Sequence, residues 1–318
     1  MTLALGKKTR TPPTFTLPHW LKSSLYFIVI VIVLALVWEG YKLLAAPGGV
    51  YLIGTGPVKV EEERVPGPLC DSIGLCEVEL PIRADDRAMP HIKDMVTTLF
   101  DPPRRNAEEM LIQILFRASL FTLQEAIVGF LIGGILGFSL GVLFAHSNLL
   151  ERGLLPYVVA SQTVPLLAIA PMVVIWLGGN WLSVAIIAAY LTFFPVTINT
   201  LRGLRSPEPT ALELMRSYAA TPWEILWKLR VPAAMPYIFT ALKISATASV
   251  VGAIIGELPS GIADGLGRII LNFNQYYATG PEKLWATILF ASLTGMAFFL
   301  IIVILEKIFV RHQAADAA

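Results

Sequence analysis

Long apolar runs separated by short polar segments dominate the hydrophobic pattern of the chain. A helix needs about 20 mostly apolar residues to cross the ~30 Å hydrocarbon core of a membrane. The runs that reach this length cover residues 25–46, 119–145, 155–178, 181–203, 236–257 and 284–306. The pattern therefore predicts an all-α, polytopic membrane protein with about six transmembrane helices.

Composition agrees with this prediction and excludes other classes. Of the 318 residues, 55% are hydrophobic and 15% are charged, whereas soluble domains carry about 25% charged residues. The formal net charge is only +1, so bulk charge provides no basis for binding nucleic acid. We expect the chain to lie in membrane lipid and to bind no nucleic acid.

Basic residues predict the orientation, because loops on the cytoplasmic side carry an excess of Lys and Arg. Those assigned inside are Lys7, Lys8, Arg10, Lys22, Arg152, Arg202, Arg205, Arg216, Lys228, Arg230, Lys243, Lys307 and Arg311. The short outer loops hold only Arg268 and Lys283. Both termini are therefore predicted to be cytoplasmic. The expected layout is a cytoplasmic segment 1–24, a first span 25–46, an extracytoplasmic segment 47–118, a core 119–310 with a cytoplasmic loop 204–235, and a tail 311–318.

The extracytoplasmic segment combines an irregular part with helical parts. Residues 47–89 are rich in Pro and Gly and contain the two cysteines, Cys70 and Cys76. A disulfide on the oxidising side of the membrane is favoured over two free thiols. Residues 91–100 and 107–118 have helical periodicity, which predicts interfacial helices.

One polar stretch inside the core, ELMRSYAATPWEILWKLRVP from Glu213 to Pro232, is predicted to form two short helices. Thr221 followed by Pro222 is a helix start, with a hydroxyl N-cap and proline at the first helical position. A tight joint is expected at Ala219–Ala220, and the second helix is expected to end near Pro232. The segment either connects two spans or docks on a cytoplasmic partner.

This stretch resembles the cytoplasmic EAA loop of binding-protein-dependent ABC transporter permeases, whose pattern is E, five residues, G, nine residues, then I-x-L-P. Glu213 and Pro232 match its ends, ELM stands for EAA, and Ala219 stands for the glycine. If the joint needs a positive φ, alanine costs about 1 kcal/mol there. The resemblance implies that the loop couples to a separate ATP-binding subunit. The residues it assigns to coupling are Glu213, Arg216, Ala219, Pro222, Trp223, Leu229 and Pro232.

The resemblance covers about 90–310 and includes SQTVPLLAIAPMVVIWLGG, VVGAIIGEL and GLGRII. It implies a type I ABC importer permease in a bacterial cytoplasmic (inner) membrane, working with an ATP-binding subunit and an extracytoplasmic solute-binding protein. Two nucleotide sites need two coupling surfaces, so a homodimer of this chain is the economical assembly. TLQEAIVGF, SQTVP and ELMRSYAAT resemble the nitrate/sulfonate/taurine-type branch, and lean to its riboflavin and thiamine-pyrimidine members. The insert at 47–88 has no recognised counterpart.

The sequence lacks the residue patterns that ATP binding and metal binding require. The pattern G-x-x-x-x-G-K-[ST] does not occur, so we expect a non-enzymatic chain whose ATP and Mg²⁺ are bound by the partner ATPase. The four histidines are scattered, which argues against a metal site. A secondary transporter remains the competing class, and it would need buried ion-coupling acids; Glu39, Glu125 and Glu257 lie within or near spans.

A translocation path should be lined by polar residues on apolar spans. The candidates are Gln162, Thr163, Asn199, Ser245, Ser249 and Glu257, with close packing of small residues as the alternative explanation for the serines. Between Ser161 and Thr200 there is no Lys or Arg. This favours a small heteroaromatic solute over an oxyanion such as nitrate, a sulfonate or taurine, because aromatic and amide side chains suit the former. Such side chains are Trp176, Trp181, Tyr190, Phe193, Gln162 and Asn199.

Overall fold

The computed structural model describes residues 29–40, 90–103 and 109–315, and the chain separates into two compact units, Met1–Ile92 and Lys93–Ala318. In the first unit, the apolar helix Val29–Gly40 is tied to the segment that ends this unit. Trp38 Nε1 donates to the Pro90 carbonyl at 3.2 Å, and Glu39 accepts a hydrogen bond from the Ile92 amide at 2.8 Å. The predicted Cys70–Cys76 disulfide and the 47–88 insert lie outside the described residues.

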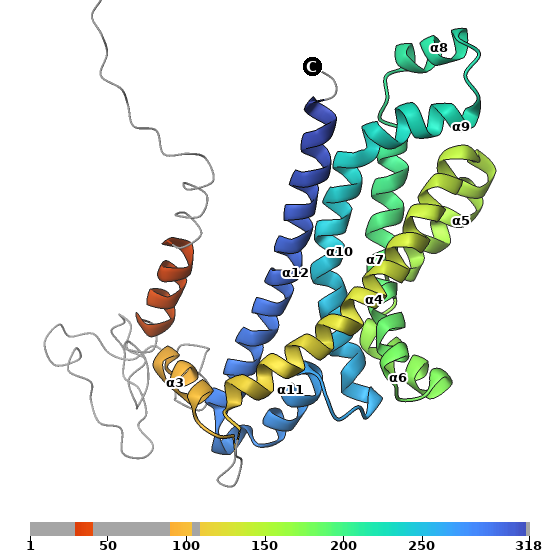
Figure 1. Cartoon of the computed structure of the whole chain (residues 1–318). Helices are drawn as coiled ribbons and strands as arrows, with labels where there is room; N and C mark the ends of the chain where they lie inside the picture. Colours follow the sequence, from red (N-terminus) through yellow and green to blue (C-terminus); the bar gives the residue numbers. More distant parts are fainter. Residues whose placement is uncertain (1–28, 41–89, 104–108, 316–318) are drawn as a thin grey trace, which may run out of the picture. The chain divides into compact units, whose positions relative to one another are not determined.

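The second unit is built from helices in its described part (Figure 1). In chain order these are α3 (Ile92–Thr97) with a 3-10 turn (Thr98–Phe100), α4 (Leu111–His146), α5 (Asn148–Ser161), α6 (Leu166–Leu177), α7 (Trp181–Leu204), α8 (Pro209–Ser217), α9 (Pro222–Ile225), a π-helical turn (Leu226–Arg230), α10 (Val231–Ser260), α11 (Leu266–Gln275), a 3-10 turn (Tyr277–Thr279) and α12 (Pro281–Ala315). Four stretches of the described residues are long and apolar enough to span a membrane: Leu111–His146, Trp181–Leu204, Pro222–Ser260 and Pro281–Phe309. The predicted all-α polytopic membrane fold is confirmed, whereas the count of six spans is not.

A stripe of glycines on α4 joins this helix closely to α7. Gly129, Gly133, Gly137 and Gly141 recur every four residues and therefore lie on one face of the helix. A Cβ added at Gly133 would lie 2.5 Å from the Ala189 carbonyl oxygen and 2.7 Å from the Thr192 Cβ. The α4 and α7 backbones are in direct contact along this stripe, as in small-residue helix pairs of other membrane proteins.

Small side chains extend the same packing to α10. Ala126 of α4, Ala188 of α7 and Ala246, Val250 and Ala253 of α10 are buried in one cluster. Small residues let helices approach closely inside a membrane, where burial against lipid gives no hydrophobic gain. The three helices α4, α7 and α10 thus form the centre of the unit.

Two predicted segments have a different helical arrangement in the structure. The predicted single span 155–178 is a pair of helices, α5 and α6, bent by 98°. The bend follows from Pro165, which precedes α6, lacks an amide hydrogen and restricts the backbone of Val164. Of the predicted interfacial helix 107–118, the residues from Leu111 onward are the start of α4, and Leu111 and Leu115 are buried against Leu266 of α11.

Candidate functional site: the helical loop between α7 and α10

The loop between α7 and α10 contains α8, a helix that buries none of its residues. Glu213 and Arg216 are exposed on it, and within the described part of the chain neither side chain has a hydrogen bond or ion pair. Leu214 is 58% exposed and Tyr218 is 79% exposed. An apolar and charged surface of this kind, at the tip of a loop, is suited to binding another protein.

The predicted joint at Ala219–Ala220 is confirmed. Ala219 has a φ of 54°, and it is the only non-glycine residue with a positive φ among the described residues. The Ala219 amide donates to the Arg216 carbonyl at 2.9 Å, and the Ala220 amide donates to the Met215 carbonyl at 3.0 Å. These are the two hydrogen bonds of a Schellman motif, which normally places glycine at the left-handed position. Alanine at 219 therefore carries the steric cost that glycine avoids.

The start of α9 also follows the prediction. Thr221 Oγ1 accepts a hydrogen bond from the Glu224 amide at 3.3 Å, and Glu224 Oε2 accepts one from the Thr221 amide at 3.0 Å. This reciprocal pair is a capping box. Glu224 also forms an ion pair with Lys228 at 2.9 Å. Its side chain therefore contacts the residue before the helix and a residue one turn after it.

Two exposed tryptophans lie on this segment, Trp223 on α9 and Trp227 in the π turn that follows it. The rings of Trp223 and Trp227 meet edge to face at 5.6 Å, and Trp223 is 67% exposed. A shallow groove of ≈ 460 Å³ lies beside them between α9 and the end of α4. Its lining residues are Ser139, Val142, Leu143, His146, Thr221, Pro222, Trp223 and Leu226.

The predicted end of the second helix near Pro232 is wrong. The helix that begins at Pro222 continues through the π turn into α10 as far as Ser260. Proline normally breaks a helix, because its ring meets the carbonyl one turn earlier and it has no amide to donate. Here the Val231 amide bonds to the Leu226 carbonyl five residues back, which shifts the hydrogen-bond register just before Pro232. The helix therefore passes the proline without ending.

The loop is anchored to the bundle by a few side chains. Leu226 is buried with Leu204, Ala234 and Ile238, which belong to α7 and α10. Leu229 and Pro232 are half-buried. As a result, α8 and α9 extend from the same end of the unit as the last turns of α12, while α11 lies at the opposite end (Figure 1).

The structure separates the residues predicted to line a path. Ser245, Ser249 and Glu257 are fully buried between helices, and Ser245 donates to the Thr192 carbonyl of α7 at 3.3 Å. They reach no surface in this conformation, and their assignment to a path stays a prediction. For the two serines, close helix packing explains the small polar side chain.

The other three candidates lie near a surface. Thr163 is exposed, and Gln162 and Asn199 are half-buried. Gln162 and Thr163 occupy the break between α5 and α6, and the Gln162 Nε2 is buried without a hydrogen-bond partner among the described residues. The Asn199 amide instead bonds to the Pro195 carbonyl of its own helix at 2.8 Å. Of these three residues, Gln162 at the break is therefore the one whose side-chain nitrogen donates to no acceptor among the described residues.

Membrane-length helices around a small-residue core, with a capped helical loop at one end, are the architecture of a membrane-embedded protein. Residues 129–314 match the family of binding-protein-dependent transport system inner membrane components, and the chain belongs to this family. Its members are the membrane component of ABC importers rather than the ATPase. Such a permease works in general with an ABC ATP-binding subunit and a binding protein.

Named relatives carry different solutes. The chain is 36% identical to the formylaminopyrimidine transport permease protein ThiX of Halalkalibacterium halodurans, over 59% of this chain and 74% of the relative. It is 30% identical to the riboflavin transport system permease protein RibX of Chloroflexus aurantiacus, over 64% and 74% of the two chains. It is 31% identical to a putative aliphatic sulfonates transport permease protein SsuC of Bacillus subtilis, over 57% and 64%.

Proposed function

We propose that this chain is the transmembrane subunit of an ATP-driven importer that carries a small heteroaromatic nutrient of the pyrimidine or flavin type. A separate binding protein delivers the solute from outside, and separate ATP-binding subunits supply the energy. The importer would sit in a bacterial inner membrane with both termini of this chain in the cytoplasm. Nitrate, a sulfonate or taurine is the alternative solute for the same machinery.

The solute class rests on the break between α5 and α6 together with the relatives. The segment from Ser161 to Thr200 contains no Lys or Arg, so no fixed cation faces an oxyanion from this segment. It does contain the Gln162 Nε2, which has no hydrogen-bond partner among the described residues, and the neighbouring rings of Tyr190 and Phe193, whose centroids are 5.8 Å apart. The relatives at 36% and 30% identity are named for formylaminopyrimidine and riboflavin.

The loop carrying α8 and α9 is the proposed docking site for the ATP-binding subunit. Glu213 and Arg216 offer free charges on α8, and Trp223 offers an exposed ring on α9. Charged groups around an aromatic anchor are the usual composition of a specific protein interface. Through this contact, the closure of the ATP-binding subunits would move the helices that continue from the loop.

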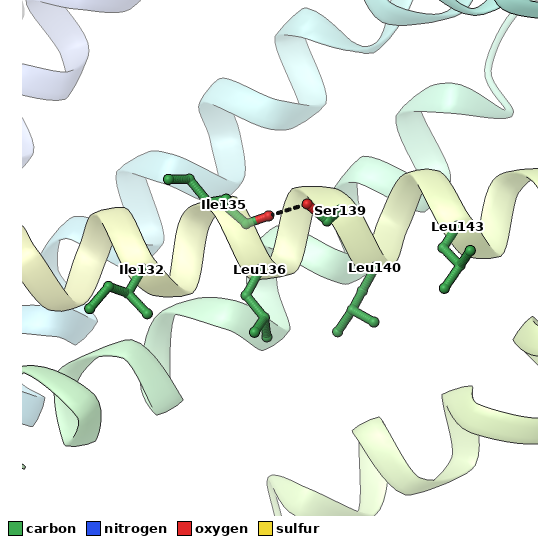
Figure 2. Close-up of a pocket in the computed structure, with 6 residues that line it drawn as sticks. All are labelled: Ile132, Ile135, Leu136, Ser139, Leu140 and Leu143. Atoms are coloured by element: carbon green, nitrogen blue, oxygen red, sulfur yellow. Dashed lines mark hydrogen bonds between the residues drawn. The ribbon is translucent and has the colours of Figure 1, made fainter.

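We further propose that two copies of the chain form the pathway. The open side of α4 presents Ile132, Leu136 and Leu140 in one direction (Figure 2). Each of them directly precedes a glycine of the stripe that contacts α7, so this face lies about a quarter turn round the helix from the stripe. This apolar face can meet lipid or a second subunit. A homodimer would provide the two coupling loops that two ATP sites require.

The solute is tested with the binding protein encoded beside this chain, whose thermal stability is measured with candidate ligands. Stabilisation by pyrimidines or flavins is expected, followed by uptake of the same compound into proteoliposomes that contain the complete transporter. Stabilisation by nitrate or an alkylsulfonate alone would refute the heteroaromatic assignment. Uptake that persists without the ATP-binding subunit would indicate a secondary transporter.

The docking role of α8 is tested by Glu213→Lys, which reverses a charge that has no partner inside the described chain. Transport and ATP hydrolysis stimulated by the binding protein should be lost while the permease stays folded in the membrane. Glu208→Lys makes the same charge change five residues away, at a position that does not match the coupling pattern. Equal loss in both variants, or normal stimulation in Glu213→Lys, would contradict a specific docking role.

A further inference from the structure

Helix α11 begins without a capping side chain of its own. Gly265 occupies the N-cap position, so the first amides of α11 need hydrogen-bond acceptors from elsewhere. The Leu266 amide donates to Thr122 Oγ1 of α4 at 2.9 Å, and the Gly267 amide donates to Glu257 Oε2 of α10. Side chains of two spanning helices therefore cap a third helix.

Thr122 and Glu257 are themselves joined, which makes the cap one network. Thr122 Oγ1 donates to Glu257 Oε1 at 2.6 Å, and both side chains are fully buried. The hydroxyl thus accepts from Leu266 and donates to Glu257 at the same time. In this way two hydrogen bonds fix the start of α11 to α4 and α10, and a third joins α4 to α10.

Glycine is required where α11 meets the carboxyl group. Gly265 has a φ of 102°, and a Cβ there would lie 2.4 Å from the Glu257 Cδ. At Gly267 a Cβ would lie 2.3 Å from the Ile254 carbonyl oxygen and 2.9 Å from Glu257 Oε2. The backbone turn is packed directly against the carboxyl group, so the site is closed on this side.

A second carboxyl group lies against Glu257 from α4. Glu125 is only 2% exposed, and it stands three residues after Thr122. Residues three apart share one face of a helix, so the Glu125 carboxyl group lies on the side of α4 where Thr122 binds the Glu257 carboxyl group. Neither Glu125 oxygen accepts a hydrogen bond from any donor in the described part of the chain.

Two ionised carboxylates in this position would be unstable. Both would offer only acceptors to each other, and like charges at short distance in a buried site repel strongly. The groups that face Glu125 and Glu257 are each other, the Thr122 hydroxyl and the Gly267 amide, and no Lys, Arg or His of the described chain is among them. One proton removes the repulsion and creates the missing donor.

We propose that Glu125 and Glu257 form a proton-binding site in which Glu125 stays protonated and its O–H donates a hydrogen bond to the Glu257 carboxylate. The assignment follows from the donors, because Glu257 accepts hydrogen bonds from Thr122 and Gly267 while Glu125 accepts none. The remaining negative charge lies at the N-terminus of α11, where the helix dipole favours an anion. The bound proton thereby holds the α4–α10–α11 contact together.

The site lies at the end of the unit opposite the α8–α9 loop (Figure 1). Glu125 and Glu257 are therefore positioning residues for α11 and the loops around it. The presence of the proton does not depend on which solute is carried, so its test needs only the purified permease.

The test is infrared spectroscopy of the full-length permease in lipid nanodiscs at neutral pH. A carbonyl band of a buried, protonated carboxyl group is expected, and it should shift when glutamate carboxyl carbons are isotopically labelled. Glu125→Gln should abolish this band completely while keeping the melting temperature, because the glutamine amide still donates to Glu257. Glu306→Gln is the matched control, since Glu306 is paired with Lys243 at 2.9 Å and should leave the band unchanged.

Three results would overturn the proposal. The first is the absence of the carbonyl band in the wild-type protein. This measurement does not depend on the folding of any variant. The second is a band that survives Glu125→Gln. The third is a melting temperature that rises with added Na⁺, Mg²⁺ or Ca²⁺ in the wild type but not in Glu125→Gln, which would assign a metal cation to the site in place of the proton.

Discussion

The contact between α4 and α7 can be tested with two adjacent glycines of α4. Gly133 faces α7, whereas a Cβ added at Gly134 meets no atom within 4 Å. Replacing either one by alanine makes the same chemical change in the same helix. The gain in helix propensity, about 1 kcal/mol in the helix interior, is therefore common to both variants.

The magnitude follows from the distances at Gly133. The new Cβ would lie 2.5 Å from the Ala189 carbonyl oxygen and 2.7 Å from the Thr192 Cβ, whereas apolar carbon atoms rest about 3.5–4.0 Å apart. The two helices would have to separate by about 1 Å, or lose their register along the stripe. Overpacking of this kind costs about 1–3 kcal/mol, and we expect this difference in the free energy of unfolding between Gly133→Ala and Gly134→Ala.

The assay is thermal or denaturant unfolding of both purified variants in the same detergent or nanodisc. Gly134→Ala should match or exceed the stability of the wild type, and Gly133→Ala should be clearly less stable than Gly134→Ala. Equal stability of the two variants would show that the helices are not packed backbone to backbone. Measuring the stability of the same two variants in bilayers of a different thickness distinguishes an effect on helix packing from an effect of hydrophobic mismatch.

Further predictions concern the loop and its neighbours. Ala219→Gly should raise the free energy of unfolding by up to about 1 kcal/mol, because glycine adopts the positive φ without steric cost; unchanged thermal unfolding would contradict this. Thr221→Ala should cost about 0.5–2 kcal/mol by removing the cap, seen as faster hydrogen exchange at the Glu224 amide, while Thr221→Ser should retain protection. The partly exposed Glu151–Arg205 pair should show a coupling of about 1 kcal/mol or less in a double-mutant cycle, and exchanging the two residues should restore the stability that each single reversal loses.

Features that depend on neighbouring residues were predictable from the sequence. The hydroxyl N-cap at Thr221 and the joint at Ala219 are both confirmed, since a cap is determined by residues within one turn. The predicted spans 181–203, 236–257 and 284–306 all lie inside helices of the structure, because long uncharged runs leave few alternatives to a membrane helix.

Other features have sequence signals that hydropathy alone does not reveal. The four-residue spacing from Gly129 to Gly141 is a pattern typical of a closely packed helix face, and this face of α4 is the one that contacts α7. Pro165 marks the break in 155–178, but an average over the whole apolar run conceals it. Pro232 suggested a helix end, and only the shifted hydrogen bond from Val231 to Leu226 shows why the helix continues.

Contacts between distant residues were not predictable in this way. From the sequence, Glu257 is a polar residue on an apolar span. That position is compatible with lining a translocation path and with belonging to a buried hydrogen-bond network. Its partner Thr122 is 135 residues away, and the Lys243–Glu306 pair joins α10 to α12 across 63 residues. Such pairs depend on how helices pack, which hydrophobic periodicity leaves open.

The continuous helix from Pro222 to Ser260 links the two ends of the permease. It contains 39 residues and is therefore about 58 Å long at 1.5 Å per residue. At one end it carries Trp223 on the proposed docking loop, and at the other it carries Glu257, which caps α11. Had the helix ended at Pro232, a movement of the loop could be absorbed at that break. Because the helix continues, a displacement of α9 by the ATP-binding subunit must either bend the π turn or move the Glu257 end with it, and the capped α11 would then follow.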